Sequence, residues 1–259
     1  MKRIKLFLSF FLVVFFASCF EVNEEIVINE NGTGTYQTKM EMGQLLEMIQ
    51  SMAGEEELKK EGMDRVIDTT IFMRTLLDSA KDATPEQKDL LKDGKLHLAM
   101  NMKEKVFNAE VNLPFKKLEN LQLLMSGNGN SSTGITQLFK NVFNKPDRKE
   151  EVIDGPKEPG LDDINNIYDV TISNGVISKK LNEGRYKAML ERPEMEQMKQ
   201  MSSTGMEILY STTTKLPRPV KKSDNPLIKL SDDKKTVTLK YNLVDLFSTP
   251  EKYSYRIEY

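Results

Sequence analysis

Alternating apolar and polar residues recur along most of the chain and predict β-strands with one buried face. Ile26 and Ile28 lie on one side of the first such segment, whereas Glu25 lies on the other side. The Asn-Gly pair at residues 31–32 predicts a tight turn, because these residue types accept the positive φ of hairpin turns. The chain is therefore expected to return as a second strand over residues 34–40.

Two more hairpins are expected further along the chain. One spans residues 96–113, turns at residues 103–105 and is expected to end at Pro114. The other spans residues 168–180 and turns at the Asn-Gly pair 174–175. Single strands are predicted at residues 206–212, 237–243 and 253–259.

Apolar residues at helical spacing predict helices between the strands. Thr84 is expected to cap a short helix in which Pro85 takes the first helical position. Residues 66–80 fit either a strand or a helix. The other expected helices and helical turns lie at residues 42–53, 115–125, 135–143, 183–201 and 243–247.

Hairpins followed by helices are typical of an α+β fold, here an antiparallel β-sheet built from hairpins with helices packed on one face. The alternation runs to the last residue, so the C-terminus is expected to belong to the sheet. We expect one domain over residues 19–259, with a flexible excursion near residues 144–163, where prolines and charged residues accumulate.

The N-terminus has the pattern of a secretory signal. Three cations occur in the first five residues, an apolar run over residues 6–17 follows, and small residues lead into a polar stretch. The apolar run is too short to span a bilayer as a helix, which needs roughly 20 residues.

The sole cysteine of the chain follows this segment directly. Residues 16–19, Phe-Ala-Ser-Cys, resemble a lipobox, the recognition site of bacterial lipoprotein processing. The resemblance implies a cleaved signal peptide at residues 1–18, cleavage between Ser18 and Cys19, and a lipid with palmitate-type acyl chains on Cys19. The residues after Cys19 lack the aspartate associated with inner-membrane retention, so an outer-membrane location is favoured. The alternative is an ordinary secretory signal with an incidental cysteine.

Composition narrows the functional classes. Removal of the three N-terminal cations takes the formal net charge from −2 to about −5, which argues against a nucleic-acid partner. No cysteine remains after Cys19, so disulfides and thiolate metal sites within one chain are excluded. The absence of tryptophan disfavours carbohydrate binding, although the eight tyrosines keep that function open.

Candidate catalytic residues are few. His97 is the only histidine, and the alternation places it with Lys95 and Asn101 on the polar side of its strand, so we expect a solvent-facing side chain.

Paired carboxylates occur in loops or on charged faces, where solvated side chains are expected. They lie at residues 55–57, 150–151, 162–163 and 232–233. We therefore expect no enzyme, metal or cofactor, and we rank a hydrolase third among the functions.

Methionines cluster at two helical segments. Methionine provides pliable apolar surface that suits hydrophobic partners, although core filling is the plainer explanation. If a cleft opens between sheet and helices, the residues that would line it for an apolar ligand are Met42, Met48, Met52, Met195, Met198 and Met201. A carrier or sensor of a hydrophobic ligand is thus the alternative function.

Three segments resemble known lipoproteins. Residues 25–36 and 210–220, with the turn and strand at residues 230–237, resemble uncharacterised Bacteroidetes-type envelope lipoproteins and, more distantly, the LppM-type lipoprotein domain. These are turn-and-strand motifs, so the resemblance implies a fold and no catalytic residues. We predict a lipid-anchored cell-envelope lipoprotein with a non-enzymatic binding or assembly role, held to the membrane by its lipid, whose partner is another envelope protein or a lipid.

Overall fold

The computed structural model describes residues 20–43, 47, 50, 66–79, 84–126, 166–193, 195 and 207–259. The expected signal peptide, Cys19, the excursion near residues 144–163 and the expected helix at residues 135–143 lie outside the described residues. In the part of the chain that is described, no helix has both the length and the apolar character needed to cross a membrane.

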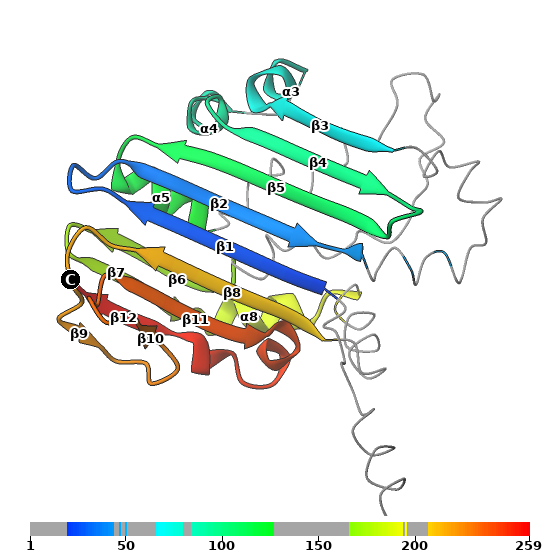
Figure 1. Cartoon of the computed structure of the whole chain (residues 1–259). Coiled ribbons are helices and arrows are strands. Elements are labelled where there is room, and N and C mark those ends of the chain that lie inside the picture. Colours follow the sequence, from blue (N-terminus) through cyan, green and yellow to red (C-terminus); the bar gives the residue numbers. More distant parts are fainter. Residues whose placement is uncertain are drawn as a thin grey trace, which may run out of the picture.

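Eight strands form the larger sheet, in the order β10-β11-β8-β1-β2-β5-β4-β3 (Figure 1). In chain order they are β1 (Phe20–Ile28), β2 (Gly34–Glu41), β3 (Ile67–Phe72), β4 (Lys95–Asn101), β5 (Val106–Phe115), β8 (Ile208–Lys215), β10 (Lys229–Leu230) and β11 (Thr236–Asn242). Neighbouring strands are antiparallel, except that β1 and β8 run parallel. β1 therefore lies inside the sheet and pairs along its whole length on both sides.

Four strands form a smaller antiparallel sheet that lies behind the larger one in Figure 1. Its order is β6 (Tyr168–Ser173), β7 (Val176–Leu181), β12 (Tyr255–Glu258) and β9 (Lys222–Ser223). The described helices are α3 (Met73–Ser79), α4 (Pro85–Leu91), α5 (Leu118–Ser126) and α8 (Glu183–Leu190), with the 3-10 helices η1 (Leu243–Phe247) and η2 (Pro250–Tyr253). Figure 1 shows α5 behind the larger sheet as well, on the same side as the smaller sheet.

The predicted α+β class and the antiparallel hairpins are confirmed. The predicted C-terminal strand forms, but it covers Tyr255–Glu258 and belongs to the smaller sheet, whereas a single sheet was expected. Gly32 adopts a φ of +78° in the first turn and Gly175 a φ of +95° in the turn between β6 and β7, as their Asn-Gly pairs predicted. Thr84 and Gln87 form the capping box that opens α4, with a hydrogen bond of 3.2 Å from the Gln87 N–H to Thr84 Oγ1. The smaller sheet and the parallel pairing of β1 with β8 were not expected.

Three boundaries differ from the sequence predictions. Pro114 does not end its strand, because β5 continues to Phe115, whose buried ring extends the inner face, and α5 begins only at Leu118. Residues 66–80 form a strand followed by a helix, β3 and α3. The helix expected at residues 183–201 is interrupted: α8 ends at Leu190, and Pro193 and Met195 are helical again, because a proline without an N–H cannot continue a helix but fits its first turn. Residues 194 and 196–201 lie outside the described residues.

Of the helix expected at residues 42–53, Met42 is not helical and donates its N–H to the Phe107 carbonyl at 2.8 Å, whereas Gly43, Glu47 and Gln50 are helical. The other residues of this range lie outside the described residues. The Gln50 amide donates to the Met102 carbonyl at 3.2 Å, so this helical segment contacts the turn between β4 and β5. The helical turn expected at residues 243–247 is confirmed as η1.

The core lies between the larger sheet and the elements behind it, and it is rich in tyrosine. Seven of the eight tyrosines are buried, with exposed fractions of 8% or less. They are Tyr36, Tyr168, Tyr210, Tyr241, Tyr253, Tyr255 and Tyr259. These seven tyrosine rings thus pack inside the protein.

Candidate functional site

Two polar clusters occur in the described structure. The first, which we call the inner cluster, lies between the two sheets and consists of Glu24, Tyr36, Lys179, Tyr210 and Thr212. The second, the outer groove, lies on the opposite face of the larger sheet and is open to solvent.

The inner cluster is centred on Glu24, which is 5% exposed. Its position follows from the strand, because alternation places residue 24 on the same face as Val22 and Ile26. Thr212 is its direct neighbour on β8 and donates its hydroxyl to Glu24 Oε2 at 3.0 Å. The hydroxyls of two tyrosines on the flanking strands, Tyr36 and Tyr210, donate to Glu24 Oε1. Three hydroxyls therefore solvate a carboxylate that water does not reach.

Lys179 contributes the opposite charge from the smaller sheet. It is 7% exposed, and its ammonium lies 4.5 Å from the centroid of the Tyr168 ring, a cation–π distance. Burial lowers the pKa of Lys179, and the negative charge of Glu24 acts in the opposite direction. A carboxylate on one sheet and an ammonium on the other are thus buried in the same core.

Tyr241 extends this polar centre. Its ring stacks on Tyr210 with the centroids 5.0 Å apart and lies 4.5 Å from the ring of Tyr253. Its buried hydroxyl has no hydrogen-bond partner among the described residues. Burial, followed by the charges of Tyr210 and Glu24, raises the pKa of Tyr241 well above its ordinary value. Because all these groups are buried, the inner cluster acts on stability and on the alignment of the two sheets.

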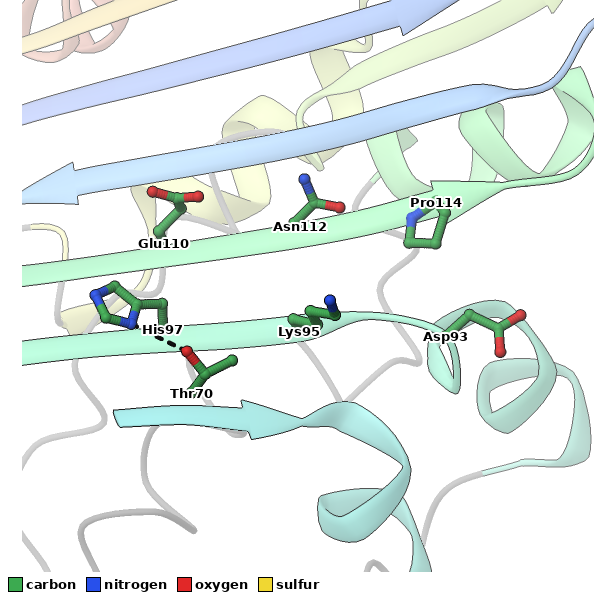
Figure 2. Close-up of a pocket in the computed structure, with 7 residues that line it drawn as sticks. All are labelled: Thr70, Asp93, Lys95, His97, Glu110, Asn112 and Pro114. Atoms are coloured by element: carbon green, nitrogen blue, oxygen red, sulfur yellow. Dashed lines mark hydrogen bonds between the residues drawn. The ribbon is translucent and has the colours of Figure 1, made fainter. Parts of the chain in front are cut away.

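The outer groove lies over β3, β4 and β5 and has a volume of about 600 Å³ (Figure 2). Its lining residues are polar or charged apart from a proline, and they are Thr70, Asp93, Lys95, His97, Glu110, Asn112 and Pro114. The strand register brings the groove residues together, because Thr70 pairs with His97 and His97 pairs with Glu110 on adjacent strands.

His97 lies on the outer face with Lys95, as the sequence predicted, and its side chain is 42% exposed. Figure 2 shows its Nδ1 directed at Thr70 Oγ1, 3.2 Å away. Its Nε2 lies 3.8 Å from Asp68 Oδ1. A hydroxyl, an imidazole and a carboxylate are thus arranged in series, but Asp68 is 79% exposed, whereas the orienting carboxylate of a catalytic triad is buried.

Charges of both signs surround the groove. Asp93 lies 3.1 Å from Lys116 Nζ and 3.6 Å from Arg74. Glu110 accepts a hydrogen bond of 2.9 Å from Gln37 Nε2. The Lys95 ammonium lies 5.6 Å from the centroid of the exposed Phe72 ring. This arrangement suits a polar partner that itself carries both charges.

The other candidates from the sequence are placed as follows. Met195 is fully buried and Met42 packs partly buried against the same core, so a role in lining a ligand stays a prediction. Met48, Met52, Met198, Met201, Ser18 and Cys19 lie outside the described residues, as do the carboxylates at residues 55–57, 150–151 and 162–163. Asp233 accepts hydrogen bonds from Ser231 Oγ at 2.5 Å and from the Lys235 N–H at 2.9 Å, and these bonds hold the turn before β11. The same hydrogen bonds lower the pKa of Asp233. Over the described ranges, no group of three or more His, Cys, Asp or Glu residues could hold a metal ion.

Sequence reasoning missed the inner cluster, although a signal was present. Glu24 has the same alternation phase as Ile26 and Ile28, and Lys179 has the same phase as Ile177. A charged residue in phase with buried aliphatic residues indicates either a partner across the core or an error in the strand assignment.

A double-mutant cycle tests the coupling across the core. We expect Glu24→Gln and Lys179→Met to have non-additive effects on the free energy of unfolding, with a coupling of about 1–3 kcal/mol, because the two charges interact in a buried setting. The control cycle uses Lys39→Met and Glu41→Gln, an ion pair at 2.6 Å in which both side chains are 44% exposed. That pair is expected to couple by about 0.2–1 kcal/mol. Urea denaturation measures both cycles, and equal coupling in the two would contradict the assignment.

Alkaline titration tests the tyrosine-rich core. Burial raises the pKa of Tyr168, Tyr241 and Tyr255, and burial with the hydrogen bond to Asp245 raises that of Tyr253 to about 12. Above pH 10 the unfolded chain releases these protons before the folded chain does, so the free energy of unfolding falls as the pH rises. Tyrosinate absorbance and circular dichroism should therefore change together.

The variant Tyr241→Phe removes one of these titrating groups and a hydroxyl without a partner, so its transition should move to higher pH. Tyr36→Phe is the matched control, because it removes a hydroxyl that donates to Glu24 and should destabilise the fold. Tyrosinate that forms while the circular dichroism stays native would show that these phenols are accessible.

No family model matches the chain, and no curated protein matches it. Among solved structures, the chain is similar to the folded domain of LppM from Mycobacterium tuberculosis, an NMR structure. The TM-score is 0.35 and the sequence identity 5%, over 95% of this chain and 93% of that chain.

Proposed function

We propose that the chain is a lipid-anchored protein of the cell envelope, held in the outer membrane through Cys19, and that its domain has a non-enzymatic role in binding or assembling another envelope component. The observation that carries the proposal is the sequence of residues 1–19, in which a basic start, an apolar run and a lipobox-like segment end at the sole cysteine.

The physical chemistry of the anchor supports this assignment. Each buried methylene of an acyl chain contributes ~0.8 kcal/mol of membrane affinity, and stable anchoring needs two or more chains. A diacylglyceryl group on Cys19 supplies two chains. The lipobox-like residues before Cys19 are the sequence feature on which the lipid rests.

The outer groove supports the binding role. It combines hydrogen-bonding side chains such as Asn112 and Thr70 with charges of both signs, Lys95 and Glu110 among them. It lies on the outer face of the larger sheet, on three neighbouring strands whose register fixes its side chains. A polar segment of another envelope protein would find both hydrogen-bond partners and complementary charges there.

Substitution of the cysteine tests the anchor. Cys19→Ser removes the thioether, so the protein should leave the membrane fraction in high salt while its circular dichroism stays native. Ser18→Ala is the control, because it keeps a small residue before the cysteine and should stay in the membrane fraction. A Cys19→Ser protein that still pelleted with membranes in high salt would contradict the anchor.

Site-specific photo-crosslinking in intact cells tests the groove. A photoreactive side chain at Asn112 should form a defined adduct, whereas one at Thr238 should not. The control is matched, because both residues lie on the outer face in one cross-strand row and both are partly exposed. Lys95→Glu should weaken the Asn112 adduct several-fold by reversing a groove charge. Equal adducts from both positions, or none from Asn112, would contradict a binding role of the groove.

A further inference from the structure

The strand register defines two ends of the larger sheet. At one end, which we call the anchor end, β1 begins at Phe20 opposite Ile208, and β2 terminates at Glu41. The turn between β4 and β5, residues 102–105, lies at this end too, because Glu41 pairs with Asn108. At the other end, the far end, the chain turns at residues 29–33, and Figure 1 places the C-terminus there.

Covalent geometry ties Cys19 to the anchor end. Successive Cα atoms are about 3.8 Å apart, so a lipid on residue 19 is attached one residue before the first residue of β1. A strand rises about 3.3 Å per residue, so the nine residues of β1 span about 26 Å between its first and last Cα atoms. Phe20 is itself partly buried against the core, so no flexible linker separates the folded sheet from residue 19.

From this geometry we propose that the anchor end rests against the lipid headgroups and that the far end points into the aqueous phase. This inference rests on the proposed lipidation of Cys19 and goes beyond it, because a lipid on a long linker would hold the domain in no particular orientation. The occupant of the anchor end is a lipid surface.

The side chains at the anchor end suit a lipid–water interface. Leu209, next to Glu21 on the neighbouring strand, is 39% exposed, and Val66, which precedes β3, is 71% exposed. Lys103 is exposed in the turn between β4 and β5, where its ammonium can reach lipid phosphates. Lys105 is held by an ion pair of 2.7 Å with Glu47.

The orientation also determines where the outer groove is presented. Within β4, Lys95 and His97 belong to the half that begins at the far end, and Pro114 pairs with Thr35 beside the far turn. The groove therefore lies in the half of the sheet farther from the bilayer and opens sideways from the sheet face, where a partner in the aqueous phase can reach it.

Fluorescence quenching on vesicles tests this orientation. Lipidated Cys19 has no free thiol and is the only cysteine, so one added cysteine is the sole site for a thiol-reactive fluorophore. Lys103→Cys labels the anchor end and Glu30→Cys the far end; both residues are exposed and both lie in turns. The full-length processed protein is reconstituted into phosphatidylcholine vesicles that carry a nitroxide on the lipid headgroup.

We expect quenching at residue 103 to be several-fold stronger than at residue 30, because nitroxide quenching acts only at short range. Equal quenching, or stronger quenching at residue 30, would overturn the orientation while leaving the anchor intact. Intact-mass analysis and vesicle flotation of the same samples separate the two claims. A protein without lipid on Cys19, or one that does not float with the vesicles, would overturn the proposed anchor and the orientation with it.

Discussion

The position of β1 between β2 and β8 determines how the rest of the domain is built. Its antiparallel neighbour, β2, follows directly in the chain, whereas its parallel neighbour, β8, begins only at Ile208. The larger sheet is therefore complete only when the two halves of the chain pair with each other. The same strand carries Glu24 into the core and begins at Phe20, next to the proposed lipidation position. The core, the contact between the sheets and the proposed membrane attachment therefore all involve one strand.

The inner cluster has a thermodynamic cost that its geometry offsets. Moving a carboxylate and an ammonium out of water costs several kcal/mol per ion, and an interior ion pair recovers this only with good geometry and further hydrogen bonds. Glu24 has three hydroxyl donors, and Lys179 has the face of Tyr168. We infer that the pair favours one register of β1, because a shift by one residue would move Glu24 to the outer face and take Val22 and Ile26 out of the core.

The sequence predicted those elements that local chemistry determines. Asn-Gly pairs located the turns at Gly32 and Gly175, and Thr84 located the start of α4. Long-range features were not predictable in this way. No local pattern indicates that Phe20 pairs with Ile208, or that the β6–β7 hairpin leaves the larger sheet for a second one. The outer groove depends on the register of three strands, so only the outward direction of His97 could be predicted.

The central claim is that the mature chain begins at Cys19 and carries a lipid one residue before its central strand. Intact mass spectrometry of the protein extracted from its own membranes tests this most directly. The account predicts a chain that starts at Cys19 with the added mass of a diacylglyceryl group. A chain that retains residues 1–18, or one with an unmodified Cys19, would contradict it.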